Sequence, residues 1–473
     1  MVHFFIKNRY YFLFQALSLV VFIAFNKFSE AGINDGDSIS HYYISRYSWH
    51  YPYLFLDNWG KPFFILLSSP FAQLGYGGVQ FFNITCAVIS SWFCYRTAEK
   101  LDINWAYAAP VFLLFTPVYL SAVPSGLTEI LFGLVFIVSI YLMVDNKYIG
   151  CAFIISFLPF CRTEGILIIP VFGLMMLIGK KFTAIPFLLS GFLIYSGIGY
   201  FYYKDFLWIL HTNPYQTINV YGHGTLDFFF KSRSAIFSDL LGTVFAIGAV
   251  FLGFRLAEAI RNKNIPINLI IECLVIWGSF MVYFTAHSIF WYKGWFGSAG
   301  MWRVMAGIAP AFVLVTLIGF NFGISLFRKI KWLYYTISIV LITIIIVQSI
   351  HKIHQHLYEG KIAVRDACNW VKQNNLQSRK IYYSEPYTRM CLSLNPYDTL
   401  KSEVLMYVDH SNVGSDMPQK SIIIWEPGLG PNEDGLPLTR LIYNPRFLLL
   451  KKFETAHDMA KGQKYAVYVF ERE

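Results

Sequence analysis

Two carboxylates stand close together after the first apolar segment, at Asp35 and Asp37 in the sequence Asn-Asp-Gly-Asp-Ser. An Asp at the start of a helix accepts hydrogen bonds from backbone N–H groups, and the residues after Asp37 suit a helix along the membrane surface. An ionised carboxylate placed there can deprotonate or orient an incoming hydroxyl group. The pair is therefore the candidate general base, with Asp37 preferred and Asp35 second. The alternative is a plain helix cap in a solvated turn.

The same loop continues into Asp57-Asn-Trp-Gly-Lys61-Pro62, and the apolar segment after it, residues 63–71, is too short to cross a bilayer. Pro62 suits the first turn of an interfacial or re-entrant helix. We predict that Lys61 contacts a lipid phosphate, and Asp57 is included among the substrate-binding candidates. Anchoring of the helix in the headgroup layer by Trp59 and Lys61 is the alternative.

Charged residues also occur among the apolar segments, at Glu129 and in the turn Arg162-Thr-Glu164-Gly. Such charges are costly at membrane depth, so they usually pair with one another or serve function. The planar guanidinium of Arg162 is suited to gripping a phosphate through two hydrogen bonds. A structural clamp, in which Arg162 bridges Glu164 or Glu129, is the alternative. All three residues are substrate-binding candidates.

A glycine-rich and aromatic segment, residues 287–303, ends in an arginine at the start of an apolar run. A glycine-rich segment that leads into a helix start suits a phosphate or diphosphate, and the aromatic rings suit stacking on a sugar. An interfacial aromatic belt and a snorkelling arginine are the alternatives. The substrate-binding candidates in this segment are His287, Trp291, Tyr292, Lys293 and Arg303.

The elements that must position these residues are long and apolar. Of the 473 residues, 56% are hydrophobic and 14% charged, against about 25% charged in an average soluble domain. This composition argues against a water-soluble enzyme and against a disordered chain. Eleven candidate spans follow one another at about 10–28, 78–95, 105–121, 126–144, 148–160, 165–179, 182–200, 235–254, 267–287, 303–321 and 332–350.

The charge distribution divides the chain into two predicted domains. Residues 351–473 contain 30 of the charged residues, whereas residues 1–350 contain 36. We therefore predict a multi-span all-α membrane domain at 1–350, with long external loops at 29–77 and 201–234. The tail at 351–473 is predicted to be a small α/β domain, because a helical pattern at 359–375 precedes strand-like runs at 380–383, 421–425 and 465–470.

The basic residues predict the orientation. Thirteen of the 22 Lys and Arg residues before residue 351 fall in the segments that are cytoplasmic if the N-terminus is, and nine of the 14 acids fall on the opposite face. With eleven spans, the tail is then extracytoplasmic. Of the seven cysteines, Cys368 and Cys391 are expected to pair only if the tail lies in an oxidising compartment.

Together, these motifs resemble those of the GT-C superfamily of integral-membrane glycosyltransferases, in particular the protein O-mannosyltransferases and aminoarabinose transferases that use polyprenyl-phosphate sugars. The resemblance extends over residues 30–310. It is carried by the Asp-Gly-Asp motif at 35–37, Trp-Gly-Lys-Pro at 59–62, Arg-Thr-Glu-Gly at 162–165 and the Gly-rich loop running into an Arg-bearing helix at 294–303.

The resemblance implies transfer of a sugar, mannose or a similar hexose, from a polyprenyl-phosphate donor to an acceptor hydroxyl of a glycan, lipid or protein. Asp37, or Asp35, would be the base, and Arg303 would hold the donor phosphate with Lys61 and Arg162. Related enzymes often have adjacent Asp-Glu in this loop, whereas a Gly separates the two Asp residues here. Two carboxylates also suit a divalent cation, although many such enzymes are thought not to need one.

The implied setting is the extracytoplasmic face of a membrane, with a bacterial inner membrane preferred. Membrane lipid is an expected partner, and a nucleic acid is not. Two other functions stay open. A transporter or flippase for a polar or lipid-linked substrate would use deep charges such as Glu272. A structural or assembly protein would use the tail to bind an extracytoplasmic partner.

Overall fold

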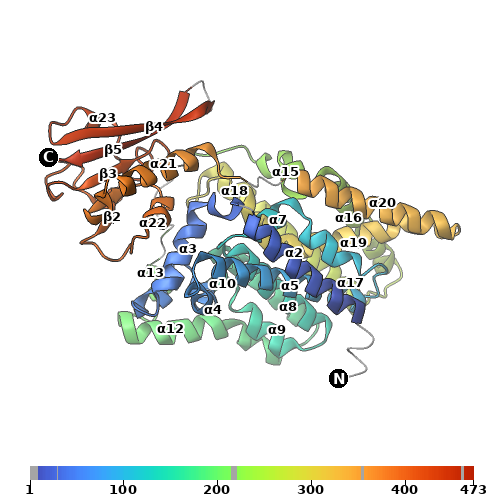
Figure 1. The fold of residues 1–473 in the computed structure, drawn as a ribbon. Helices are drawn as coiled ribbons and strands as arrows, with labels where there is room; N and C mark the ends of the chain where they lie inside the picture. Colours follow the sequence, from blue (N-terminus) through green and yellow to red (C-terminus); the bar gives the residue numbers. More distant parts are fainter. Residues whose placement is uncertain (1–8, 29, 213, 215–220, 353–355, 460–462) are drawn as a thin grey trace. The chain divides into compact units, whose positions relative to one another are not determined.

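The computed structural model describes residues 9–28, 30–212, 214, 221–352, 356–459 and 463–473 (Figure 1). The predicted loop at 201–234 is thus described only in part, since residues 213 and 215–220 lie outside these ranges. The chain forms two compact units. The first contains Met1–Phe28 and Ile44–His354, and the second contains Ser29–Tyr43 and Gln355–Glu473. The predicted loop at 29–77 is therefore divided between them.

The first unit is helical. Its α-helices are α2 (Arg9–Phe28), α4 (Pro62–Ala72), α5 (Tyr76–Lys100), α6 (Ala108–Leu114), α7 (Pro117–Ala122), α8 (Glu129–Val144), α9 (Tyr148–Ile155), α10 (Leu158–Cys161), α11 (Ile169–Ile178), α12 (Ser190–Tyr203), α13 (Trp208–His211), α14 (Phe228–Lys231), α15 (Arg233–Phe237), α16 (Asp239–Arg261), α17 (Ile267–Ile270), α18 (Gly278–Lys293), α19 (Ala309–Ser325) and α20 (Lys331–His351). The 3-10 segments are η2 (Pro52–Leu56), η3 (Thr163–Leu167), η4 (Phe182–Leu189) and η6 (Trp302–Ile308), and η5 (Ile271–Trp277) is a π-helix.

Six helices in the described residues are long and apolar enough to cross a bilayer: Tyr76–Lys100, Phe182–Tyr203, Asp239–Arg261, Ile267–Lys293, Trp302–Ser325 and Lys331–Ile350. They confirm a multi-span membrane protein. The total of eleven spans stays a prediction. Three of the predicted runs form shorter apolar helices, Glu129–Val144, Tyr148–Cys161 and Thr163–Ile178, and these carry two of the charged motifs at their ends.

Helices α16 and α19 cross with their backbones in contact. A Cβ atom on Gly248 would lie 2.1 Å from the Val315 carbonyl oxygen, and one on Gly319 would lie 2.1 Å from the Val244 carbonyl oxygen. Such close approach through small residues is the usual way in which apolar helices associate in a membrane.

The close crossing of α16 and α19 predicts that a larger residue at Gly248 destabilises the protein. Gly248→Ala is expected to lower the free energy of unfolding by about 1–3 kcal/mol, because the added methyl group pushes the two backbones apart. Thermal unfolding of the purified protein in detergent measures the change. Gly253→Ala on the same helix is the control, since a Cβ atom there has no neighbour within 4 Å. Equal unfolding midpoints for the two variants would contradict the crossing.

The second unit combines α-helices of the tail with a mixed sheet. Its segments are η1 (Ala31–Ile33), α21 (Glu359–Gln373), η7 (Leu376–Ser378), β1 (Ile381–Tyr383), α22 (Tyr387–Leu392), β2 (Ser402–Val404), η8 (Leu405–Tyr407), β3 (Ile422–Trp425), α23 (Thr439–Ile442), β4 (Phe447–Met459) and β5 (Gln463–Arg472). Helix α3 (Gly36–Tyr47) begins in this unit and ends in the first.

The strand order is β2-β1-β3-β5-β4, with β1 parallel to β2 and β3, and β5 antiparallel to β3 and β4. Helix α21 packs on β4 and β5 (Figure 1). The predicted helix and the three predicted strands coincide with α21, β1, β3 and β5. Strands β2 and β4 were not predicted, and register shifts interrupt the alternating pattern of β4.

Candidate functional site

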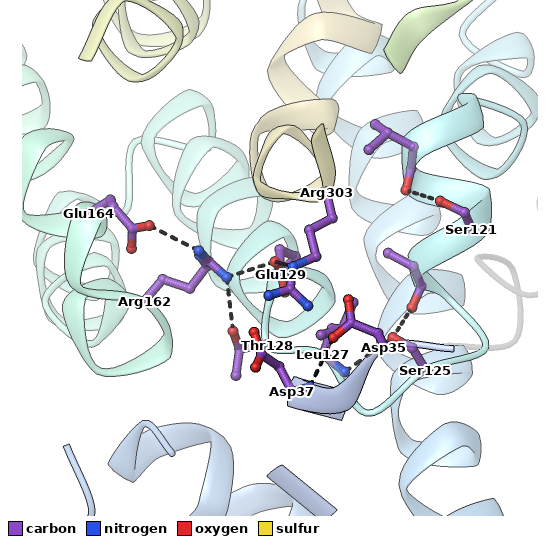
Figure 2. Close-up of polar contacts among 12 residues, drawn as sticks. Asp35, Asp37, Ser121, Ser125, Leu127, Thr128, Glu129, Arg162, Glu164 and Arg303 are labelled. Carbon is purple, nitrogen blue, oxygen red and sulfur yellow. Dashed lines mark hydrogen bonds and ion pairs between the residues drawn. The ribbon is translucent and has the colours of Figure 1, made fainter. Parts of the chain in front are cut away.

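An ionic cluster lies inside the first unit, with Arg162 at its centre (Figure 2). The guanidinium lies 2.7 Å from Glu129 Oε1 through one terminal nitrogen and 2.9 Å from Glu164 Oε1 through the other. Arg162 follows α10, Glu129 begins α8 and Glu164 lies in η3. Both predicted pairings of Arg162 are therefore present at once.

Glu129 has no exposed surface. It is positioned by the turn between α7 and α8, whose carbonyl groups are held by two amides of α5. Asn83 donates to the Ser125 and Leu127 oxygens at 2.7 and 2.9 Å, and Gln80 donates to the Pro124 oxygen at 2.9 Å. A buried carboxylate without a countercharge costs several kcal/mol, so the position of Glu129 depends on the arginines it faces.

Two further residues of the glycine-rich segment reach the cluster. Arg303 Nε in η6 lies 3.7 Å from Glu129 Oε1, and His287 Nε2 in α18 lies 3.7 Å from Glu164 Oε1. Residues from α8, η3, α18 and η6 thus meet at one place, although they are far apart in the chain. The structure brings together Glu129, Arg162, Glu164, His287 and Arg303.

Lys61 contacts the turn that carries Arg162 and Glu164. It is almost completely buried, and its Nζ donates to Thr163 Oγ1 at 2.9 Å and to the Asn58 carbonyl at 2.7 Å. Burial lowers the pKa of Lys61 to about 8, although Glu164 opposes this shift. Lys61 is therefore buried within the first unit, and its contact with a lipid phosphate stays a prediction. With Lys61, the cluster contains three basic side chains, Lys61, Arg162 and Arg303.

Asp57 shapes the turn that carries Lys61. Its Oδ1 accepts the Gly60 N–H at 2.6 Å, and burial raises the pKa of this carboxyl group. Lys61 itself has φ = 68°, a left-handed conformation that is strained for a lysine. Pro62 begins α4 as predicted. Asp57 thus contacts the chain that presents Lys61, which is a positioning role.

Asp35 and Asp37 lie in the second unit, at the start of α3. The carboxylate of Asp35 accepts the backbone N–H of Asp37 at 3.0 Å, so Asp35 is the residue that caps the helix (Figure 2). Asp37 lies in the first turn. The prediction of a helix start was right, but the capping carboxylate is Asp35 and not Asp37.

The segment around these two acids is bound to the tail. Asn34 exchanges hydrogen bonds with the backbone of His356 and Tyr358, each at 2.9 Å. A Cβ atom on Gly36 would lie 3.4 Å from the Pro386 side chain. The acidic motif is therefore supported by residues more than 300 positions away in the sequence.

The aromatic candidates have varied surroundings. Trp291 packs against two glycines, since a Cβ atom would come within 1.8 Å of its ring at Gly224 and 2.8 Å at Gly300. Tyr292 is exposed, and Lys293 Nζ lies 5.3 Å from the centre of its ring. The structure does not bring Tyr292 and Lys293 into contact with the cluster.

Sequence reasoning missed Thr128, Thr163 and Asn83, which support the cluster. Thr128 Oγ1 lies 3.4 Å from a terminal nitrogen of Arg162. Two buried amides on α5, Gln80 and Asn83, three residues apart and thus on one helix face, were the available signal.

The described residues contain no group of three or more His, Cys, Asp or Glu that could hold a metal ion. Asp35 and Asp37 could supply two carboxylates, and Mg²⁺ is commonly bound by one or two carboxylates together with water and substrate phosphates, so a divalent cation at this motif stays a prediction.

Long apolar helices and a small mixed sheet together define an integral membrane protein with an appended α/β unit. No family model and no curated protein matches the chain. Two solved structures of ArnT from Cupriavidus metallidurans share the fold, each 11% identical and with 98% of both chains covered. The TM-score is 0.61 for ArnT bound to undecaprenyl phosphate and 0.59 for its apo state. The likeness shows that this chain has the ArnT fold.

Proposed function

We propose that this protein is a membrane glycosyltransferase that moves a sugar from a polyprenyl-phosphate donor to an acceptor hydroxyl. The observation that carries the proposal is the buried cluster, in which three basic side chains, Lys61, Arg162 and Arg303, lie around Glu129, Glu164 and Thr163. Basic side chains gathered in this way are suited to an anionic ligand such as a phosphate. The shared fold supports the same class of ligand, because ArnT was solved bound to undecaprenyl phosphate.

In the proposed reaction, the acceptor oxygen forms a bond to the anomeric carbon of the sugar as the bond from that carbon to the phosphate oxygen breaks. The leaving phosphate gains negative charge, which Lys61, Arg162 and Arg303 stabilise. Asp37 takes the proton of the acceptor hydroxyl. Asp35 holds the helix start on which Asp37 lies.

The sugar, the acceptor and the location of the reaction are proposed from the sequence. The sugar is mannose or a related hexose, and the acceptor is a glycan, lipid or protein. The reaction takes place on the extracytoplasmic face of a bacterial inner membrane, with the N-terminus in the cytoplasm and residues 351–473 outside. Residues 1–350 form the catalytic domain.

A transport function finds less support. A transporter would use a charge deep in the membrane such as Glu272 to bind its substrate. Glu272 Oε2 instead lies 2.5 Å from a terminal nitrogen of Arg255. Glu272 is thus a paired acid. The pair lies in η5 and α16, neither of which supplies a residue of the cluster.

The test is to incubate the full-length protein in lipid vesicles with a panel of radiolabelled polyprenyl-phosphate and nucleotide sugars and a membrane-extract acceptor. We expect turnover of a polyprenyl-phosphate sugar that is lost in Asp37→Asn. Glu454→Gln, an exposed acid-to-amide change in the same unit, is the control and should keep activity. Turnover of nucleotide sugars alone, or of none, would contradict the proposal.

The lowered pKa of Lys61 predicts a pH dependence of sugar transfer. With a pKa of about 8, the ammonium group is lost from the free protein as the pH rises through that value. We expect kcat/KM for the donor to fall about tenfold or more between about pH 7 and about pH 9.5, because one charged contact to the phosphate disappears. A donor phosphodiester does not titrate in this range, so it adds no pH dependence.

Two variants isolate this effect. Lys61→Met should have low kcat/KM with no step near pH 8, and Lys61→Arg should remain charged throughout, since arginine does not deprotonate in proteins. A step that persists unchanged in Lys61→Met would show that another group titrates. The folded protein should also gain stability between about pH 8 and about pH 10.5, because the unfolded chain binds more protons there.

A further inference from the structure

Helices α21 and α22 of the second unit contact each other at two levels. At the first, Lys361 of α21 pairs with Glu385 before α22, and its Nζ lies 6.0 Å from the centre of the Tyr387 ring. At the second, two turns further along α21, Cys368 and Cys391 lie where α21 packs on α22, close enough for each thiol to shift the pKa of the other. The two cysteines therefore face each other across a helix pair that is held in register on one side by an ion pair.

The two thiols differ in ways that suit a cross-link. Cys368 is completely buried, whereas Cys391 is partly exposed. The neighbouring Cys368 thiol lowers the pKa of Cys391, which favours the thiolate. A thiolate that reagents can reach is the form that attacks a disulfide. The remaining cysteines, all in the first unit, are Cys86, Cys94, Cys151, Cys161 and Cys273.

We propose that Cys368 and Cys391 are joined by a disulfide in the mature protein, formed by a disulfide oxidant of the extracytoplasmic compartment. The proposal rests on the predicted extracytoplasmic location of the tail, because thiols of this kind stay reduced in the cytoplasm. It does not depend on the transferase activity.

The chemistry balances with a carrier disulfide as the oxidant. The Cys391 thiolate attacks one carrier sulfur, which forms a mixed disulfide and releases the second carrier sulfur as a thiolate. The Cys368 sulfur then attacks Cys391 and displaces the first carrier sulfur. Two electrons and the two thiol protons of the protein pass to the carrier, which leaves as a dithiol.

The cross-link would fix the part of the tail that supports the acidic motif. Pro386, directly before α22, packs against Gly36 between Asp35 and Asp37. A covalent bond between α21 and α22 removes conformational freedom from the chain between residues 368 and 391 in the unfolded state. Helices α21 and α22 would then be joined at two points, by the Lys361–Glu385 pair and by the disulfide. The start of α3 packs against Pro386 next to these points.

The test uses the full-length protein expressed in a bacterial inner membrane. Cells are quenched in acid, the protein is denatured with N-ethylmaleimide and digested with trypsin without reductant, and peptides are identified by mass. We expect residues 366–372 joined to residues 390–401, with a mass two hydrogen atoms below the sum of the free peptides. Cys151 should be alkylated in every sample. Reduction before alkylation should convert the joined species into two alkylated peptides.

Cys368→Ser is the control, and in this variant Cys391 should be alkylated. Recovery of both wild-type peptides in alkylated form without reduction would overturn the proposal. A second measurement exposes the purified, reduced protein to oxidised glutathione at low concentration. Failure to form the intramolecular link there would also overturn it, because the two thiols would not be in bonding reach. Either result leaves the transferase assay unaffected, so the two proposals fail separately.

Discussion

Arg162→Met is expected to destabilise the protein by about 3–5 kcal/mol and to abolish sugar transfer. The substitution keeps much of the side-chain volume but removes the guanidinium that contacts Glu129 at 2.7 Å and Glu164 at 2.9 Å. Glu129, which has no exposed surface, then loses its nearest countercharge. Breaking one side of a buried ion pair costs this much because the remaining charge is not compensated. Thermal unfolding in detergent measures the loss of stability.

Three controls separate charge from size. Arg162→Lys keeps the charge but cannot contact both acids through a planar fork, so an intermediate loss is expected. The double variant Arg162→Met, Glu129→Gln should unfold at a higher temperature than Arg162→Met alone. In the double variant, no buried carboxylate is left without its nearest cation. Arg96→Met breaks an i,i+3 pair with Glu99 and should cost at most about 1 kcal/mol. An equal cost for Arg96→Met and Arg162→Met would contradict the central place of Arg162.

Asp37→Asn is expected to reduce kcat about 10²–10⁴-fold with little change in stability. The amide has almost the same shape as the carboxylate but cannot accept the proton of the acceptor. The start of α3 is retained, because Asp35 supplies the cap by accepting the Asp37 N–H at 3.0 Å. The measurement is the rate of sugar transfer at saturating donor, with an unfolding curve for each variant.

Asp35 variants decide which acid is the base. Asp35→Asn should keep most of the activity, because asparagine caps a helix about as well as aspartate, whereas Asp35→Ala should cost about 1 kcal/mol of stability. The reverse outcome, with Asp35→Asn inactive and Asp37→Asn active, would assign the base to Asp35. Full activity of the double variant Asp35→Asn, Asp37→Asn would exclude a base from this motif.

Much of the architecture follows from the sequence alone. Apolar runs of membrane length predict spanning helices, because a bilayer core accepts a backbone only when its polar groups are satisfied within the segment. The tail helix and three of its strands follow from periodicity in the same way. Pro62 at the start of α4 and the helix that begins near Asp37 also follow, since proline and a capping acid act on neighbouring residues.

The sequence also identifies residues by the cost of their burial. Glu129, Arg162 and Glu164 stand out because charges in apolar surroundings require a partner. The sequence could name possible partners of Arg162 but could not choose among them, and the structure shows that it contacts Glu129 and Glu164 together. The same limit applied to Glu272, whose partner Arg255 lies 17 positions away.

Only the tertiary structure decided which of the candidates meet. The sequence suggested a place in the headgroup layer for Lys61, but the structure buries it. The Asp57 carboxylate holds the turn before Lys61, and the Lys61 ammonium donates to the hydroxyl of Thr163. The residues around Asp35 and Asp37 belong with the tail, through contacts that cross more than 300 positions. Helix starts and spans depend on residues a few positions apart and are therefore local. The choice of an ion-pair partner depends on how helices from distant parts of the chain pack, and no local pattern records that packing.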